Sequence, residues 1–218
     1  MGPVKRGERV NWMDMTVREF QAALASSSPT PGGGTAAAVA LGQAAALSIM
    51  VCDLTIGKEK WNDGWAIAEA VQSEAIPLLN KSGALAQDDS DAFDAVMNGF
   101  SLPKSTEHEV ETRRNAIRAA TLEAANVPFE TAVMAANLLE LLPELAAKGN
   151  ANAVSDVGVA GLLASAAAKG AVFNVEINLD SLPEGMGESL RDQLPELKTR
   201  VKVSSRKVME AVRKRLES

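Results

Sequence analysis

The sequence predicts an all-α fold, and three observations support this prediction. Alanine, the residue with the strongest helix propensity, is abundant along the whole chain. Aromatic residues make up only 4% of the sequence and tyrosine is absent, although strands favour aromatic and β-branched residues. One stretch, VFNVEINL, alternates like a strand, but no second candidate strand exists to pair with it. We therefore expect a multi-helical bundle, and we expect residues 1–218 to form a single domain because no linker or repeat divides them.

The first two helices are predicted from a capping box and a glycine-rich turn. Thr16 and Glu19 have capping-box spacing at the start of residues 15–26. After three glycines, Thr35 can cap an alanine-rich helix that ends near Thr55. That helix is long enough to span a bilayer, but small residues on every face favour the buried centre of a bundle. A membrane span is the alternative.

The remaining helices are placed by capping residues, glycine and proline. Thr106 and Glu109 form a second capping box, and Gly149 is predicted to end a helix. Ser155 or Asp156 is predicted to cap the helix that follows. Four prolines are expected to bound or interrupt helices, and these are Pro128, Pro143, Pro183 and Pro195. The expected helices span residues 62–85, 86–100, 107–124, 129–147, 157–179 and 196–217.

Charge and cysteine content exclude several classes of protein. The net charge is −6, whereas a nucleic-acid-binding protein should show a basic stripe, so we expect no nucleic-acid partner. The only cysteine, Cys52, cannot form an internal disulfide and has apolar neighbours. The N-terminal segment MGPVKRGERVNW lacks the apolar core of a secretory signal. We therefore expect a cytoplasmic protein without a membrane partner.

The stretch SSSPTPGGGT places three glycines directly before a helix. Gly32, Gly34 and Ala37 match the spacing of a dinucleotide-binding fingerprint, but that motif needs a preceding strand within a βαβ unit. We therefore reject nucleotide binding. A glycine loop that leads into a helix N-terminus instead offers free N–H groups to an anion or a polarised oxygen atom. A plain tight turn is the alternative interpretation.

Acid–base chemistry in this chain must come from carboxylates or lysines. His108 is the only histidine, and no His/Cys cluster has metal-ligand spacing. In the segment QDDSDAF, Asp89 shares a helix face with Phe93, whereas Asp88 and Asp91 share another face. Asp89 is therefore the acid expected to be partly buried, where desolvation raises the pKa of a carboxyl group. Alternatively, these acids only decorate the first turn of a helix.

Six segments of the sequence form a recognisable series. They are SSSPTPGGGT, LTIGKEKW, DDSDAFDAVM, LPKSTEHE, GNANAVSDVGVAGL and NVEINL. Together, and in this order, they resemble the cyclodeaminase/cyclohydrolase family. This family includes the C-terminal domain of formiminotransferase-cyclodeaminase and stand-alone methenyltetrahydrofolate cyclohydrolases. The resemblance covers residues 13–215, nearly the whole chain.

This resemblance implies a homodimer that binds a tetrahydrofolate derivative near the subunit interface, with no metal and no cofactor beyond the folate substrate. It identifies Asp89 as the catalytic residue. The substrate-binding residues that it suggests are Pro31, Gly32, Gly33, Gly34, Lys58, Lys104, Asp156 and Asn174. The lysines would meet the glutamate carboxylates of the folate, and the glycines would let the pterin approach the backbone. The chain departs from the family pattern at Gln87, Trp61 and Thr35, where Asp, Tyr and Ser are common.

The activity expected from the resemblance is hydrolysis of 5,10-methenyltetrahydrofolate to 10-formyltetrahydrofolate, with Asp89 as the acid/base. The 218 residues contain no formiminotransferase domain that would supply a formimino group, which favours hydrolysis over deamination. One alternative is a free-standing formimidoyltetrahydrofolate cyclodeaminase that releases ammonia. The other is a non-catalytic folate-binding protein that keeps the helical fold.

Overall fold

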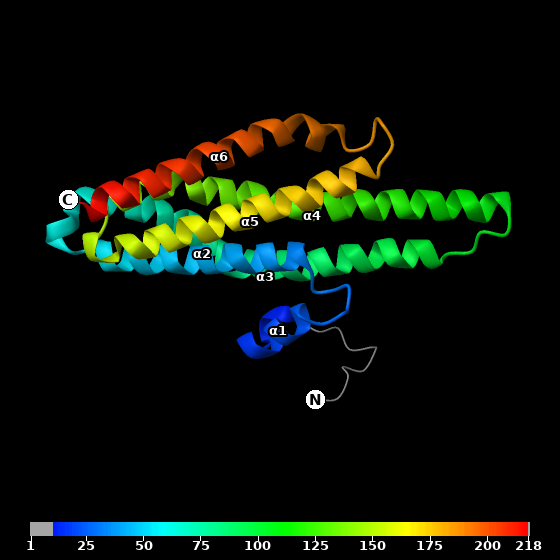
Figure 1. Ribbon diagram of the computed structural model, residues 1–218, viewed down its shortest axis with the longest axis horizontal. Coiled ribbons are helices and arrows are strands. Elements are labelled where there is room, and N and C mark those ends of the chain that lie inside the picture. The colour runs from blue at the N-terminus through cyan, green and yellow to red at the C-terminus, as the bar shows by residue number, and fades with distance from the viewer. Residues whose placement is uncertain (1–10, 218) are drawn as a thin grey trace.

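A computed structural model describes residues 11–217 and confirms the all-α prediction (Figure 1). No residue in this described part of the chain lies in a β-strand. The six α-helices are α1 (Val17–Leu24), α2 (Gly33–Thr55), α3 (Trp65–Ser101), α4 (Glu107–Lys148), α5 (Val154–Asp180) and α6 (Glu188–Leu216). The described residues also form three short 3₁₀ helices: η1 (Trp12–Asp14) precedes α1, η2 (Glu59–Gly64) lies between α2 and α3, and η3 (Ala151–Ala153) lies between α4 and α5.

Helices α2 to α6 lie along one common axis, and α1 lies to one side of this bundle (Figure 1). A single large core of buried alanine, leucine and valine side chains joins the five long helices. Within α2 the buried residues are mostly small, so neighbouring backbones can approach closely. The predicted buried alanine-rich helix is therefore confirmed as α2.

Two segments, Gly33–Thr55 and Ala151–Asp180, are long and apolar enough to span a membrane by length and composition. About half of each most apolar window, 50% and 56% respectively, is buried inside the protein. Core helices of helical bundles share these properties, so length and hydropathy do not separate the two interpretations.

Several predicted helix boundaries are wrong, because helices continue where the sequence predicts a break. Residues 65–100, predicted to belong to two helices (62–85 and 86–100), lie in the single helix α3, and residues 62–64 belong to η2. Helix α4 runs through Pro128 and Pro143, and α6 starts at Glu188 and runs through Pro195. A proline inside a helix removes one backbone hydrogen bond at a cost of about 3 kcal/mol. Burial of long apolar faces in the shared core outweighs that cost here.

The backbone hydrogen bond that α4 lacks at Pro128 is replaced by one from a side chain of α5. Because Pro128 has no N–H, the carbonyl group of Ala124, four residues earlier, lacks its helical donor. The Nδ2 group of Asn178 donates a hydrogen bond to this carbonyl oxygen at 2.7 Å. Asn178 therefore satisfies the orphaned acceptor and ties α5 to α4 at this point.

The capping predictions hold at three helix ends and fail at two. Both capping boxes, Thr16 with Glu19 and Thr106 with Glu109, are formed, and Gly149 caps the end of α4. The N-cap of α2 is Gly32, and the Thr35 hydroxyl instead accepts a bond from the Gly32 N–H at 3.4 Å. Helix α5 begins at Val154, directly after η3, and its N-cap is Ala153, so Ser155 and Asp156 lie in its first turn and do not cap it.

We predict that Asn178→Ala lowers the free energy of unfolding by roughly 1–2 kcal/mol, because it leaves the Ala124 carbonyl without a donor. In a Pro128→Ala background residue 128 can supply that donor, so the same substitution should cost clearly less. Urea denaturation of the four proteins gives the coupling. Asn174→Ala is the matched control, because Asn174 donates to the Gly170 carbonyl, which no proline deprives of its helical donor. Equal costs of Asn178→Ala in both backgrounds would contradict the explanation.

Candidate active site

A cavity of about 280 Å³ lies where the loop before α2 meets α3, α4 and α5. Its lining residues are Pro29, Thr30, Gly32, Gly33, Gly34, Asp89, Phe93, Val96, Ala124, Asn174, Ile177 and Asn178. Asp89 is the only titratable side chain among them. Four of the predicted substrate-binding residues, Gly32, Gly33, Gly34 and Asn174, are thus brought together with Asp89. Pro31 is buried directly beside them in the loop.

The Asp89 carboxylate lies directly against the backbone at the start of α2. A Cβ atom added to Gly34 would lie 2.0 Å from Asp89 Oδ1, so a larger residue at that position would displace the carboxylate. A Cβ atom added to Gly33 would meet nothing within 4 Å. Gly33 and Gly34 occupy the first two positions of α2, whose N–H groups have no partner within the helix. The site therefore combines a carboxylate with backbone donors at a helix N-terminus.

Asp89 is partly buried, as its spacing on the helix predicts, whereas its neighbour Asp88 is exposed. Burial raises the pKa of the Asp89 carboxyl group above its ordinary value, and hydrogen bonds from Thr35 offset part of this rise. The Thr35 hydroxyl donates to Asp89 Oδ2 at 2.9 Å. A carboxyl group with a raised pKa can accept a proton and return it more readily than a fully solvated one.

Pro31 adjoins the cavity without lining it, and three further predicted substrate-binding residues lie away from it. Lys58 and Asp156 are both at the opposite end of the bundle, Lys58 after α2 and Asp156 at the start of α5. Helix α2 ends at Thr55, which lies about 32 Å from Gly34 at 1.5 Å per residue. Lys104 lies in the turn between α3 and α4, beside a separate hollow that Glu111 and Arg114 also line. The roles of these three residues stay predictions.

The sequence prediction missed several lining residues, although all of them except Ala124 lie in segments that the sequence analysis singles out. Asn178 lies in the segment NVEINL, one helical turn beyond Asn174, so the two share a face. Ala124 had no such signal, because its exposure to the cavity depends on the path of α4. Phe93, which shares a helix face with Asp89, also lines the cavity.

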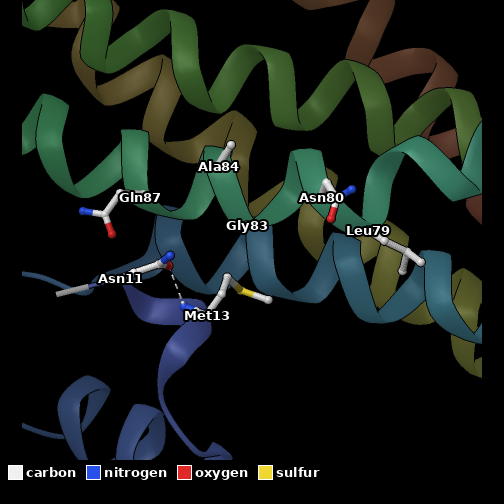
Figure 2. Close-up of a pocket in the computed structure, with 7 residues that line it drawn as sticks. All are labelled: Asn11, Met13, Leu79, Asn80, Gly83, Ala84 and Gln87. Atoms are coloured by element: carbon white, nitrogen blue, oxygen red, sulfur yellow. Dashed lines mark hydrogen bonds between the residues drawn. The ribbon is translucent and has the colours of Figure 1, made fainter.

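A second cavity, of about 490 Å³, lies between the N-terminal segment and α3. Figure 2 shows Asn11 and Met13 of that segment facing Gly83 and Gln87 of α3. None of its seven lining residues is titratable. Although it is the larger of the two cavities, its lining offers no group for acid–base chemistry, so we assign the candidate site to the Asp89 cavity.

Other residues with catalytic potential lie outside the site. His108 is exposed in the first turn of α4, which fits its interpretation as a surface residue. Cys52 is buried in the core, and this burial raises the pKa of its thiol to about 12. Among residues 11–217, no three His, Cys, Asp or Glu side chains are grouped to hold a metal ion.

These features define a class of protein: a helical bundle in which a partly buried carboxylate faces the N-terminal backbone of a core helix. The family model described as formiminotransferase-cyclodeaminase matches residues 16–194, a range that includes every residue lining the cavity. The chain therefore belongs to the formiminotransferase-cyclodeaminase family, as the sequence motifs indicate.

Individual relatives cover most of the chain. A methenyltetrahydrofolate cyclohydrolase from Methylorubrum extorquens is 40% identical over 169 residues, which are 78% of this chain and 81% of that relative. A formimidoyltransferase-cyclodeaminase from Rattus norvegicus is 30% identical over 91% of this chain, but the chain spans only 35% of its length. The crystal structure of a formiminotetrahydrofolate cyclodeaminase from Thermotoga maritima matches with a TM-score of 0.81 at 28% identity, over 92% of this chain and 97% of that chain.

We predict that Asp89→Asn raises the free energy of unfolding at neutral pH. Folding raises the pKa of this carboxyl group. At pH values between the unfolded and the folded pKa, the folded state therefore binds more protons than the unfolded state. Stability therefore falls as pH rises from about 4, the pKa of an unfolded Asp, through the folded pKa, and stays lower above it. The asparagine variant lacks this loss.

Urea denaturation of both proteins at about pH 4 and about pH 8 measures the difference. Asp88→Asn is the matched control, because it removes one negative charge from the exposed adjacent residue. A gain for Asp89→Asn that is as large at the lower pH as at the higher one would show that burial of the charge is not its cause.

Proposed function

We propose that the protein is a methenyltetrahydrofolate cyclohydrolase, which converts 5,10-methenyltetrahydrofolate to 10-formyltetrahydrofolate. The observation that carries this proposal is the partly buried Asp89 carboxylate, which faces the open first turn of α2 in the candidate cavity. The similarity to a cyclohydrolase over 81% of that enzyme's length supports the same activity.

The proposed reaction uses Asp89 first as a base and then as an acid. In the substrate, one carbon bridges two nitrogens and carries a positive charge, which a nearby carboxylate stabilises. A water molecule adds to this carbon while Asp89 accepts one of its protons. Asp89 then gives this proton to the departing nitrogen as the carbon–nitrogen bond breaks. The hydroxyl group loses its remaining proton to solvent, and a formyl group remains on the other nitrogen.

The backbone at Gly33 and Gly34 complements this chemistry. Their N–H groups lie at the positive end of α2 and can donate to the oxygen atom that becomes the formyl oxygen. Asn174 uses its Nδ2 group on the Gly170 carbonyl, so its Oδ1 atom is the part suited to accept from the pterin. The reaction needs only water and the folate substrate, with no metal or other cofactor.

Exposed side chains on α3 support a path for the rest of the folate. Phe93, Met97 and Phe100 are exposed at helical spacing and lead away from the cavity. This apolar stripe ends near Lys104, beside the exposed end of α4 that carries Arg114. We propose that the benzoyl ring of the folate lies along the stripe and that Lys104 meets its glutamate carboxylates.

Cyclodeaminase activity is the second candidate. The Thermotoga maritima structure, whose name gives this activity, matches nearly the whole chain. Both reactions pass through a carbon bound to two folate nitrogens and one further oxygen or nitrogen, so the same carboxylate can serve either. The identity of 40% to a cyclohydrolase favours hydrolysis. A non-catalytic folate-binding protein is the remaining alternative, and the partly buried Asp89 argues against it.

We further propose that the protein is a homodimer. Helix α5 exposes Leu162, Phe173 and Ile177 at 59%, 63% and 69%, and adjacent α2 exposes Met50 and Leu54. Exposed apolar faces of this extent mark interfaces. The face borders the candidate cavity at Ile177.

An antiparallel pairing of two copies across this face explains the three distant residues in part. It would bring Lys58 and Asp156 of one copy toward the Asp89 cavity of the other, although they lie at the far end of their own bundle. Their predicted role in substrate binding then depends on the dimer. A cytoplasmic location, and the lack of nucleic-acid and membrane partners, stay predictions from the sequence.

The pair Gly34→Ala and Gly33→Ala tests the site. A Cβ atom at residue 34 displaces the Asp89 carboxylate, whereas one at residue 33 meets open space. We expect Gly34→Ala to lower kcat for loss of methenyltetrahydrofolate absorbance by at least about 100-fold, because small displacements of catalytic groups cost that much. Gly33→Ala should keep kcat within about tenfold and act mainly on KM. Equal kcat values for both variants would contradict the assignment of Asp89 as the acid/base.

A charged residue in the apolar face tests the dimer. We expect Leu162→Glu to shift the protein toward monomer in sedimentation velocity runs, because it places an unpaired charge in the proposed interface. Val203→Glu, at an exposed apolar position of α6 outside the face, is the control and should leave the sedimentation coefficient unchanged. A wild-type protein that sediments as a monomer at all concentrations would contradict the proposal.

A further inference from the structure

The N-terminal segment reaches the candidate site through a tryptophan. The indole Nε1 group of Trp12, in η1, donates a hydrogen bond to Ser90 Oγ at 2.9 Å. Trp12 also packs against a small cluster that includes Ala38 of α2 and Ala86 of α3. The hydrogen bond between Trp12 and Ser90 joins two residues that are 78 positions apart in the sequence.

The hydrogen bonds continue from Ser90 to the carboxylate. Ser90 Oγ lies 3.1 Å from Thr35 Oγ1, and Thr35 Oγ1 donates to Asp89 Oδ2 at 2.9 Å. Both hydroxyl groups are buried, since Ser90 is 2% and Thr35 0% exposed. Trp12, Ser90, Thr35 and Asp89 therefore form one continuous chain of hydrogen bonds, which we call the Trp12–Asp89 chain.

Simple counting of hydrogen atoms fixes the direction of the Trp12–Asp89 chain. An indole N–H can only donate, an ionised carboxylate can only accept, and each hydroxyl group has one hydrogen to give. The Thr35 hydrogen is used on Asp89, so the Ser90 hydrogen must point to Thr35. The Trp12 hydrogen completes the series by pointing to Ser90. All three donors thus point toward the carboxylate.

We propose that Trp12 and Ser90 are positioning residues, which hold the Thr35 hydroxyl so that it donates to Asp89 and keeps this carboxylate ready to accept a proton. This inference rests on the proposed function for its role in turnover. Trp12 makes the series one-way. If protonated Asp89 donated a hydrogen bond back to Thr35, the Thr35 hydroxyl would have to donate to Ser90 instead. Ser90 would then receive hydrogen bonds from both Thr35 and Trp12, and its own hydrogen would lose Thr35 as its acceptor. The series therefore favours return of the proton from Asp89 to the departing nitrogen.

Among residues 11–217, few other titratable side chains lie near Asp89, so a change in its pKa can be assigned to its hydrogen bonds. No titratable side chain lines the cavity from α4, from α5 or from the loop that precedes α2. On α3 itself, Asp88 and Asp91 adjoin Asp89 in sequence but lie outside the lining. On α5, Glu176 pairs with Lys198 of α6, and on α4 Glu123 is exposed and hydrogen-bonded to Asn126.

The first test compares pH profiles of kcat/KM. Trp12→Phe keeps an aromatic ring but removes the N–H donor, so we expect the acid limb of the profile to move upward by roughly half a pH unit to one unit, with KM nearly unchanged. Ser90→Ala should give the same shift, and the double variant should shift no further than Ser90→Ala alone.

Met13→Ala is the matched control, because Met13 contacts Gly83 from the same segment without joining the chain of hydrogen bonds. An acid limb that stays in place in Trp12→Phe, or that moves as far in Met13→Ala, would overturn the proposal.

The second test does not need turnover. The protein has three tryptophans, so its ¹⁵N–¹H spectrum contains three indole signals, which single Trp→Phe variants assign. The Trp12 indole signal should titrate with the Asp89 carboxyl group, and this titration should vanish in Asp89→Asn. A Trp12 signal that does not move with pH in the wild-type protein would overturn the inference. If the signal titrates as expected but no folate is hydrolysed, the chain of hydrogen bonds stands and the proposed function falls.

Discussion

The contact between the Asp89 carboxylate and the backbone of Gly34 is the constraint on which the rest of the structure depends. It requires α2 and α3 to lie close together. Gly42 lies about two turns further along α2 and makes a similar contact with the antiparallel α3. A Cβ atom added to Gly42 would lie 2.4 Å from Ser82 Oγ. The small side chains of α2 therefore do more than favour a helix. They bring a carboxylate from one helix against the free N–H groups of the other.

This arrangement works against stability and in favour of chemistry. Partial burial of a carboxylate destabilises the folded state at neutral pH, and the Thr35 hydroxyl offsets only part of that effect. The same burial moves the pKa of Asp89 in the direction that acid–base catalysis needs. Thr35 is thus part of the site although it does not line the cavity. Its hydrogen-bond partners extend the site to Ser90 and, through Ser90, to Trp12.

Much of this could be predicted from sequence because it depends on local spacing. Asp89 is distinguished from Asp88 by its place on the apolar face of one helix, and the glycine loop by its place before another. What could not be predicted depends on contacts between distant segments. Pro128 is tolerated within α4 only in the context of the packed bundle, where Asn178 of α5 takes over its missing donor. The partnership of Trp12 with Ser90 has no signature in either segment alone. Lys58 and Asp156 show a second limit of sequence analysis, because they lie at the other end of the bundle from Asp89. The order of motifs in a sequence does not say whether their residues meet within one copy of the chain.

The measurement that tests the central claim most directly is the loss of methenyltetrahydrofolate absorbance with wild-type protein and with Asp89→Asn, each after its folate affinity has been measured. The account predicts that wild type accelerates the loss, and that the variant binds folate with similar affinity but accelerates it at least about 100-fold less. Equal acceleration by both proteins would contradict the role of Asp89. No acceleration by wild-type protein that binds the substrate would contradict cyclohydrolase activity itself.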